Sequence, residues 1–575
     1  MPPRTVYLET FGCQMNELDS ELVAGQLRAL GYSFAADPDA ADVVLYNTCS
    51  VREHAEQKVW SRLGELALRK RLEPALVVGV LGCLAERDGT DLAKRMPVVD
   101  ILCGPGELDK LPALLDNAVR TRESLLSDRA TEFGTAKSVS SRSASPLVSA
   151  AQFALQGNAS RRSATLAAAQ DNLELLDLSR AVSPTDHNGS AYVRITRGCN
   201  KFCTYCVVPF TRGAEIHRPP DHIIDECKRL ADAGIIEVTL LGQTVNHYRF
   251  EHGAAVSLSG ITQPQKGRSY SGGHSRDPFA GDHTTTFADL LARIHDEVPA
   301  IQRLRFVTSY PRDFGDDVLE AIRDHPRICR YLHVPAQSGS DRILKLMNRG
   351  YTASEYLDFL DRARAHLHQP AIGRPLMVSG DFIVGFPTET DDDFAATLHL
   401  LHLARYKSAF IFKYSPRPGT TAFDNLPDDV PEPVKRRRNN DLLAAQSAIS
   451  DEIARAHVGT TASVMVEGLS RRELKRAGKT KSEIRRAESV TLTISGRDPA
   501  PTSDDSCGSG CHTHADEATT ASAAPVQLTA RTDGDLIVLF DAPPGRAPDD
   551  LIGRIVTVRI TSADRLSLHA TLIDP

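Results

Sequence analysis

Three closely spaced cysteines constrain this chain more than any other feature of its sequence. Cys199, Cys203 and Cys206 fall in the run Gly198-Cys199-Asn200-Lys201-Phe202-Cys203-Thr204-Tyr205-Cys206, which follows an apolar, strand-like segment. Thiolates at this spacing can hold one [4Fe–4S] cube. Because three cysteines cannot ligate every iron of the cube, one iron stays open, as in catalytic metal sites. A zinc site is the alternative, but zinc normally takes a fourth nearby ligand and this run provides none.

The open iron indicates a specific chemistry. It can bind S-adenosylmethionine (SAM) through the amino and carboxylate groups, which brings the sulfonium next to the cube. One electron then splits the sulfonium into methionine and a 5′-deoxyadenosyl radical, which abstracts hydrogen from an unactivated carbon. The motif therefore predicts a radical SAM enzyme, in which the protein provides geometry and excludes water.

A second set of cysteines lies near the N-terminus. Cys13, Cys49 and Cys83 each follow a short apolar segment that we predict to be a strand of a parallel sheet. Because the carboxyl ends of neighbouring parallel strands converge on one edge, these thiols are expected to hold a second, auxiliary [4Fe–4S] cube with an open iron. The alternative is three unrelated buried thiols. Cys103 also follows an apolar segment and is predicted to be a bystander, since a fourth ligand would close the cube.

The apolar segments divide the chain into three folded parts. Residues 3–120 alternate strand-like and helical segments, which predicts an open α/β domain with a parallel sheet. Residues 121–185 are rich in Ser and Ala and are predicted to be a flexible linker. Six strand–helix repeats in residues 186–440 predict a partial or complete β/α barrel, with a surface insertion at about 249–286. Its strands are expected at Tyr192–Thr196, Glu237–Leu241, Arg303–Thr308, Tyr331–Val334, Asp381–Val384 and Ala409–Tyr414.

The C-terminal part, residues 456–575, changes to short strand-like segments that predict a small β-barrel. A low-complexity stretch at 497–523 interrupts it, and its Ser, Asp and Thr content favours disorder over a metal site. Metal-binding side chains in that stretch are Cys507, Cys511, His512 and His514. Strands are expected at Ala462–Glu467, Ser489–Ile494, Val526–Ala530, Leu536–Phe540, Ile555–Ile560 and Ser567–Leu572.

Net charge restricts the possible partners. At −7 it does not favour nucleic acid, so an RNA partner needs a local basic patch. Between residues 471 and 486 eight basic residues stand against two glutamates, which predicts phosphate contacts; a solvated basic loop is the alternative. The basic residues are Arg471, Arg472, Lys475, Arg476, Lys479, Lys481, Arg485 and Arg486.

The apolar pattern also bears on the compartment. No apolar run is long enough to span a membrane, and the first residues pass into a strand-like stretch without room for a targeting peptide. These features predict a cytoplasmic protein with no membrane partner, whose eleven cysteines are thiols or metal ligands rather than disulfides. A mitochondrial location is the alternative if the N-terminus is incomplete.

Several longer motifs resemble the MiaB-type tRNA methylthiotransferases of the radical SAM superfamily. The similarity covers nearly the whole chain apart from the linker and the two insertions, and it includes all six cysteines proposed as cluster ligands. The motifs are Thr10-Phe11-Gly12-Cys13-Gln14-Met15-Asn16, Thr48-Cys49-Ser50-Val51-Arg52-Glu53, Gly82-Cys83-Leu84-Ala85-Glu86-Arg87, Cys206-Val207-Val208-Pro209-Phe210-Thr211-Arg212-Gly213, Pro335-Ala336-Gln337-Ser338-Gly339-Ser340 and Tyr414-Ser415-Pro416-Arg417-Pro418-Gly419-Thr420.

The resemblance implies an N-terminal methylthiotransferase domain, a radical SAM barrel and a C-terminal TRAM domain that binds RNA. It also implies the reaction, which adds a 2-methylthio group to N6-isopentenyladenosine beside the tRNA anticodon. Two [4Fe–4S] clusters and two SAM molecules are implied: one SAM methylates a sulfur on the auxiliary cluster, and the other yields the radical that activates C2. The implied partners are tRNA, a flavodoxin- or ferredoxin-type electron donor, and proteins that donate sulfur and clusters.

The same resemblance implies binding residues near the strand ends. Tyr205 resembles the usual neighbour of the SAM adenine, and ordinary aromatic packing is the alternative. For the other candidates the alternatives are a tight turn and ordinary loop polarity. The SAM methionine is expected near Gly242, Gln243 and Asn246. SAM or substrate is expected near Gln337 and Ser338.

Two related activities and one unrelated class compete with this interpretation. Methylthiotransferases also act on threonylcarbamoyl-adenosine in tRNA and on a ribosomal-protein aspartate, but the strings Gln14-Met15-Asn16 and Ser50-Val51-Arg52-Glu53 favour the isopentenyladenosine type. A non-catalytic RNA-binding protein with a structural cluster is disfavoured by the open iron. The chain departs from the family pattern at four positions: His217 stands where the family usually has Ser, Thr244 where it has Asn, Tyr310 where it has His, and Thr388 where it has Gly.

Overall fold

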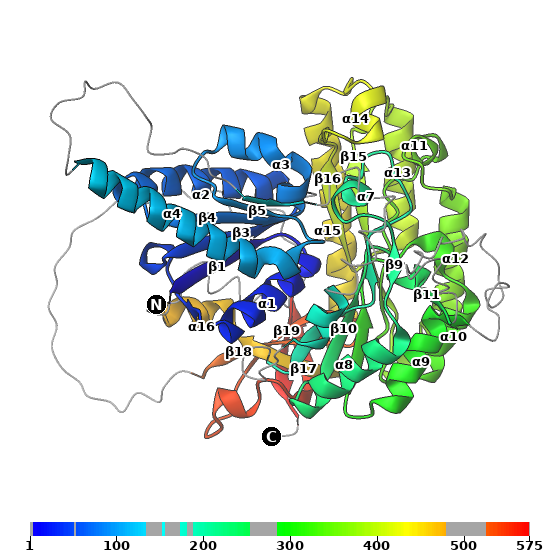
Figure 1. Cartoon of the computed structure of the whole chain (residues 1–575). Helices are drawn as coiled ribbons and strands as arrows, with labels where there is room; N and C mark the ends of the chain where they lie inside the picture. The colour runs from blue at the N-terminus through cyan, green and yellow to red at the C-terminus, as the bar shows by residue number, and fades with distance from the viewer. Residues whose placement is uncertain are drawn as a thin grey trace, which may run out of the picture.

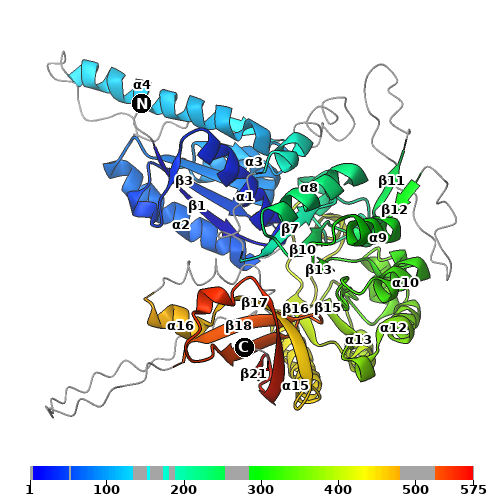
Figure 2. The same cartoon turned by 90° about the horizontal axis from the view of Figure 1, so that it is seen from below.

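Three domains pack against one another in the computed structural model of the chain (Figures 1 and 2). The structure describes residues 4–50, 53–133, 152–155, 173–180, 188–252, 284–478 and 525–573. In Figure 1 the blue N-terminal domain lies beside the green-to-yellow barrel, and the red C-terminal barrel lies beneath both. In those ranges, none of the helices combines the length and the apolar character needed to cross a bilayer.

A parallel sheet with the order β2-β1-β3-β4-β5-β6 forms the N-terminal domain, as predicted. Its strands are β1 (Thr5–Phe11), β2 (Ser33–Phe34), β3 (Val43–Thr48), β4 (Val77–Gly82), β5 (Ile101–Cys103) and β6 (Gln152–Ala154). Its helices are α1 (Gln14–Ala29), α2 (Glu53–Leu72), α3 (Cys83–Arg95) and α4 (Leu111–Phe133). Strand residues alternate between two cores: Val43 and Leu45 pack with α1 and α4, while Val44 and Tyr46 pack with α2 and α3.

The structure differs from the prediction of a flexible linker at 121–185. Helix α4 runs to Phe133, and β6 pairs in parallel with β5 as the last strand of the sheet. Residues 173–178 form a further helix that contacts the barrel through ion pairs described below. A three-residue strand between Ser- and Ala-rich stretches has no periodicity, so the composition of the segment concealed it.

The central domain is a partial β/α barrel. Its six parallel strands form two sheets, β7-β10-β13 and β14-β15-β16, which meet where Leu304 pairs with Ile328. Within the described residues no pairing joins β7 to β16, so this side is open. The strands are β7 (Ser190–Arg194), β10 (Glu237–Leu241), β13 (Arg303–Phe306), β14 (Tyr331–His333), β15 (Met377–Val384) and β16 (Ser408–Lys413). The outer helices are α8 (Pro220–Asp232), α9 (Phe287–Glu297), α10 (Asp316–Asp324), α12 (Ala353–Leu367), α13 (Asp391–Ala404) and α15 (Glu432–Arg455).

The barrel and the other two domains also contain short strands and short helices. The predicted surface insertion leaves and re-enters the barrel through an antiparallel pair of strands, β11 and β12. The short strands are β8 (Thr196–Arg197), β9 (Ile216–His217), β11 (Arg249–Glu251) and β12 (Thr284–Thr286). The short helices are α7 (Val208–Thr211), α11 (Asp341–Leu346), α14 (Thr421–Asn425), α16 (Arg471–Arg476), η1 (Pro38–Ala40), η2 (Leu108–Lys110), η4 (Val245–His247), η5 (Pro311–Asp313), η6 (Pro370–Ile372) and η7 (Pro548–Asp550).

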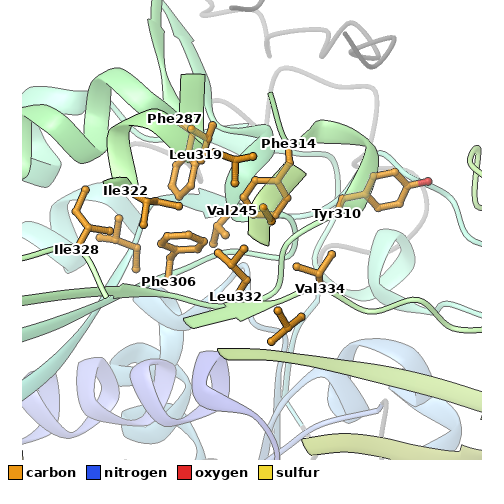
Figure 3. Close-up of a cluster of buried hydrophobic side chains, with 14 of the residues drawn as sticks. Val245, Phe287, Phe306, Tyr310, Phe314, Leu319, Ile322, Ile328, Leu332 and Val334 are labelled. Atoms are coloured by element: carbon orange, nitrogen blue, oxygen red, sulfur yellow. The ribbon is translucent and has the colours of Figure 1, made fainter. Parts of the chain in front are cut away.

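The two faces of the barrel strands have different surroundings. On the outer face, Phe306 and Leu332 pack against the helices in one continuous hydrophobic core (Figure 3). There the rings of Phe287 and Phe306 meet edge to face, with centroids 5.1 Å apart. On the inner face, Tyr331 and Met377 instead pack into the core of the N-terminal domain. The N-terminal domain therefore closes part of the lumen that the open barrel leaves uncovered.

The C-terminal domain is a closed barrel in the order β17-β18-β19-β21-β20, as predicted. Its strands are β17 (Thr461–Leu469), β18 (Gln527–Thr532), β19 (Ile537–Asp541), β20 (Ile555–Ala563) and β21 (Leu568–Leu572). The predicted strand Ser489–Ile494 lies outside the described residues. The turn between β18 and β19 caps the amino ends of the barrel strands: Arg305 Nη2 donates to the Thr532 carbonyl at 2.7 Å, and Lys407 Nζ pairs with Asp535 at 2.6 Å.

Candidate functional site

The three N-terminal cysteines stand at the carboxyl ends of adjacent strands. Cys13 is the N-cap of α1 after β1, Cys49 follows β3 directly, and Cys83 is the first residue of α3 after β4. The loops are in contact, because a Cβ on Gly12 would lie 2.7 Å from the Cβ of Cys49. A negative charge on Cys13 also raises the pKa of Cys83, after the larger effect of burial. The structure thus brings together the thiols predicted to hold the auxiliary cluster.

Two buried asparagines hold these loops in place. Asn16 Nδ2 donates to Asn47 Oδ1 at 3.0 Å, and Asn47 Nδ2 returns a bond to the Asn16 carbonyl at 2.9 Å. Gly82, directly before Cys83, has φ +87°, and a Cβ there would lie 2.8 Å from the Thr48 carbonyl. Only glycine fits this turn without strain. The Asn and Gly residues of the sequence motifs therefore fix the backbone that presents the cysteines.

The barrel cysteines lie in the loop after β8. Gly198 precedes them with φ +68°, and a Cβ there would lie 2.5 Å from the Gly213 carbonyl. Cys199 and Cys203 are buried, and the ring of Tyr205 meets Phe386 edge to face at 6.5 Å. Burial raises the pKa of Cys206 to about 12 and that of Cys199 well above its ordinary value. These thiols are therefore protonated at neutral pH, and cluster binding must displace their protons.

The two cysteine sets face each other across one domain interface. Helix α3, which begins at Cys83, packs against α7, which begins two residues after Cys206. A charge on Cys83 contributes to the raised pKa of Cys206, after burial and Cys203. Arg212, just after α7, has a side chain only 6% exposed and pairs with Asp19 of α1 at 2.9 Å. Two clusters held by these thiols would thus be neighbours.

Buried ion pairs fix this interface. Asp19 also accepts from Arg194 of β7 at 2.9 Å, so its carboxylate joins α1 to both the barrel sheet and the cysteine loop. Asp177, in the 173–178 helix, pairs with Arg194 at 2.7 Å and with Arg197 at 2.5 Å. The surrounding arginines lower the pKa of Asp177 against the opposing effect of burial. Through these ion pairs Asp19 and Asp177 join α1, the 173–178 helix and the barrel.

Arg349 is a buried cation beside the barrel cysteines. Its Nη1 donates to Cys203 Sγ at 3.4 Å, its Nη2 to the Pro335 carbonyl at 3.2 Å and its Nε to the Tyr351 hydroxyl at 2.9 Å. The ring of Tyr310 lies 4.6 Å from the guanidinium. No carboxylate pairs with it among the described residues, and a buried charge without a counterion is costly. An anionic cluster on Cys203 would supply that counterion, so these residues fit the implied cofactor.

Sequence reasoning missed Arg349, and it also missed a polar group around Glu215. Glu215 accepts from Thr244 Oγ1 at 2.8 Å and pairs with His247 Nδ1 at 2.7 Å. Burial raises the pKa of Glu215, but the bond to His247 and the positive charges of His247, His217 and Lys201 together outweigh burial and lower the pKa to about 2. The negative charge of Glu215 in turn raises the pKa of Cys199, after burial. His217 stands in the same group, where burial lowers its pKa to about 4.

The residues expected to bind SAM occupy the strand ends, in different ways. Asn246 is braced, because its amide exchanges two 2.8 Å bonds with the backbone of Tyr310. Ser338 Oγ lies 3.2 Å from Thr397 Oγ1 and accepts from the Ser340 backbone. The structure therefore ties Asn246 to the loop after β13, and Ser338 to α13 and to its own loop. Gly242 has no room for a side chain beside Thr196, Gln243 is half-buried, and Gln337 is buried with φ +70°.

The basic segment is described in part. Arg471, Arg472, Lys475 and Arg476 lie exposed on α16, while the predicted contacts Lys479 and Lys481 lie outside the described residues. Glu473 pairs with Arg472 at 3.0 Å and with Arg476 at 3.5 Å, so the helix keeps an excess of positive charge.

Outside the two cysteine sets, two groups of described side chains lie close enough together to hold a metal ion: Glu215 with His217 and His247, and His295 with Asp296 and His325. Cys103 is buried, and its Sγ donates to the Glu107 carbonyl at 3.2 Å. Burial raises the pKa of Cys103 well above its ordinary value, as it does for Cys199. The residues Cys507, Cys511, His512 and His514 lie outside the described residues.

Two family models match the chain. The Radical SAM superfamily model covers residues 193–401, and the model described as Uncharacterized protein family UPF0004 covers residues 5–104. The tRNA-2-methylthio-N(6)-dimethylallyladenosine synthase of Rhodopirellula baltica is 41% identical over 82% of this chain and 85% of the relative. The synthase of that name from Bordetella petrii is 35% identical over 99% of this chain and 92% of the relative.

The chain belongs to this synthase family. The UPF0004 match contains Cys13, Cys49 and Cys83, and the radical SAM match contains the other three candidate ligands together with Arg349. The resemblance and the predicted fold class are therefore confirmed.

Iron content tests the two ligand sets. Anaerobically loaded synthase should hold about eight irons per chain, in two cubes. Cys203→Ala and Cys49→Ala should each hold about four, since each removes one ligand set. Cys103→Ala is the matched control and should keep about eight. Iron and protein assays with Mössbauer spectroscopy give the counts, and a Cys49→Ala protein that keeps both cubes would reject the auxiliary set.

The cluster potential tests the position of Arg349. Replacing Arg349 with Gln removes a positive charge and a donor to a cluster thiolate, so the reduced cluster should be harder to form. Loss of a charged hydrogen bond worth about 1.5–3 kcal/mol should lower the midpoint potential of the cluster in the variant by roughly 60–130 mV. Redox titration followed by electron paramagnetic resonance measures this shift, with iron content as the folding control. Arg349→Lys should shift less, and an unchanged potential in Arg349→Gln would contradict this role.

Proposed function

We propose that this synthase transfers a methylthio group to C2 of N6-isopentenyladenosine in tRNA. The observation that carries the proposal is the meeting of two three-cysteine sets at one buried interface. Each set leaves one iron of a cube without a protein ligand, which is the arrangement of a reacting metal site. The curated relatives, named for the dimethylallyladenosine product, favour this substrate over threonylcarbamoyl-adenosine and over a ribosomal-protein aspartate.

The cofactors are SAM and two [4Fe–4S] clusters. The cluster that SAM binds is held by Cys199, Cys203 and Cys206, and the auxiliary cluster is held by Cys13, Cys49 and Cys83. When bound, these groups supply the electron that cleaves SAM and the sulfur that is transferred. The chain's own residues orient them: Asp19 and Arg212 hold the cysteine loop against α1. The region proposed for SAM and substrate is lined by Tyr205, Gly242, Gln243, Asn246, Gln337 and Ser338.

The RNA partner is proposed to contact the small C-terminal barrel. Its exposed helix α16 carries Arg471, Arg472, Lys475 and Arg476 against a single glutamate. Such clusters bind phosphates with salt-sensitive affinity. Lys479 and Lys481 extend the basic run in sequence. We further propose a flavodoxin- or ferredoxin-type reductant, donors of sulfur and clusters, and the cytoplasm as the compartment, in keeping with the bacterial relatives.

Separating the two clusters tests the reaction. Cys49→Ala should still cleave SAM, because the cluster on the barrel cysteines remains, but it should yield no methylthio nucleoside. Cys203→Ala should lose both activities. Liquid chromatography with mass spectrometry of 5′-deoxyadenosine and of tRNA nucleosides provides both readouts. Normal methylthio product from Cys49→Ala would contradict the role of the auxiliary set. If wild-type enzyme cleaves SAM but the tRNA gains no methylthio group, the proposed substrate is wrong.

Charge reversal on α16 tests the RNA contact. Lys475→Glu with Arg476→Glu should weaken tRNA binding and reduce the slope of log Kd against log salt by about 2, one for each lost phosphate contact. Arg455→Glu on α15, whose side chain is 70% exposed, is the control and should change neither quantity. An unchanged slope in the double variant would show that α16 is a solvated basic surface.

A further inference from the structure

Strand β16 borders the open side of the barrel, and its inner face is aromatic. The register pairs Asp381 with Phe410 and Ile383 with Phe412, so these four side chains share one face of the sheet. Ala409, just before Phe410, and Ile411, between the two phenylalanines, both pack against the outer helical core, which places Phe410 and Phe412 on the lumen side. Phe412 keeps 40% of its surface exposed.

Near the amino ends of the strands (the lower part) the barrel lumen is filled, whereas toward their carboxyl ends (the upper part) it is lined by polar and aromatic groups. Below, Tyr331 and Met377 pack into the N-terminal core. Above them, His333 Nε2 lies 3.1 Å from Asp381 Oδ1, and the two side chains are 10% and 22% exposed. Exposure therefore increases toward the carboxyl ends of the strands, where the barrel cysteines lie. Accessible hydrogen-bonding groups and an accessible ring are found together only in this upper part of the described lumen.

The aromatic groups are arranged as a platform. The rings of Phe410 and Phe412 are 7° from parallel, with centroids 6.3 Å apart. His333 meets Phe410 edge to face at 6.4 Å, so the His–Asp pair borders the lower ring. Parallel, accessible rings suit a flat aromatic ligand, and unpaired nucleobases bind proteins by stacking on such rings.

A series of aromatic contacts connects the residues after the platform to the barrel cysteine loop. Tyr414, two residues after Phe412, packs against Phe386 at 5.1 Å, and Phe386 packs against Tyr205 of the cysteine motif at 6.5 Å. The following loop reaches the N-terminal domain, because Arg417 pairs with Glu56 of α2 at 2.7 Å. Glu56 also binds Arg87, one turn after Cys83. Phe412 therefore stands between elements that carry both cysteine sets.

We propose that Phe412, supported by Phe410, is the stacking platform for the substrate purine of tRNA, turned out of its loop so that C2 reaches the reacting groups. His333 and Asp381 then border the edge of the purine. This inference rests on the proposed function. The adenine of SAM is the competing purine; Tyr205, which lies within the cysteine loop, is the aromatic nearer to it, whereas Phe412 is on the open side where an RNA base enters.

Equilibrium binding to paired RNAs tests the platform without requiring turnover. Anticodon stem–loops carrying either N6-isopentenyladenosine or an abasic ribose at the modified position are titrated onto cluster-loaded enzyme. Wild type should bind the base-containing RNA about 5- to 150-fold more tightly than the abasic RNA. Phe412→Ala should lose most of that discrimination, and Phe412→Tyr should restore it. Phe423→Ala on α14, with a ring 46% exposed, is the matched control and should retain the wild-type ratio.

The outcomes separate the competing explanations. Phe412→Ala should keep its iron content, its SAM affinity and its SAM cleavage without RNA. Loss of SAM affinity with unchanged RNA discrimination would assign the platform to SAM and overturn the inference. An unchanged discrimination ratio in Phe412→Ala would also overturn it. If wild type discriminates between the RNAs but forms no methylthio product, the proposed function fails while the platform stands.

Discussion

The carboxylate of Asp19 is the contact on which the rest of the site depends. It is fully buried, lies on α1 directly after the Cys13 loop, and pairs with Arg194 of the barrel sheet and Arg212 of the cysteine loop. Removing one partner from a buried ion pair leaves an uncompensated charge, typically at a cost of about 3–5 kcal/mol. The N-terminal domain therefore has one strongly preferred position on the barrel. That position makes two cysteine sets from separate domains into neighbours.

The interface also prepares the site for anionic groups. All six candidate ligands are buried or half-buried thiols, and burial raises the pKa of Cys83, Cys199 and Cys206. Arg212 and Arg349 supply positive charge to the two sets, but in different ways. Arg212 is balanced by Asp19, whereas the contacts of Arg349 within the described part of the chain are with neutral groups and the Cys203 thiol. A cluster on the barrel set would therefore relieve a buried charge, while at the N-terminal set Asp19 already neutralises the charge of Arg212.

The sequence predicted the parts of this arrangement that follow local rules. Apolar segments located the parallel strands, and the rule that strand ends converge was enough to join Cys13, Cys49 and Cys83. It did not reveal the pairing of Asp19 with Arg194, because nothing local links two residues 175 positions apart. Nor does the basic run at Lys435–Arg438 show from sequence that two of its cations, Lys435 and Arg438, are buried and paired with Asp428 and Glu389. Charge alone does not distinguish a solvated cation from one whose counterion comes from a distant segment.

At three of the positions that depart from the family pattern, neighbouring residues bond to the unusual side chain or its backbone, and the six cysteines are kept. Thr388 has φ +65°, a conformation that suits the usual glycine, and it is held there by Arg342 and by a 2.7 Å bond from its backbone nitrogen to Asp429. His217 and Thr244 both gather around Glu215, so two substitutions that look independent in the sequence form one coupled group in the structure. Since Glu215 acts electrostatically on Cys199, that group changes the surroundings of a cluster ligand while the ligand itself is kept. The six candidate ligands thus match the family pattern, whereas the polar group beside Cys199 departs from it.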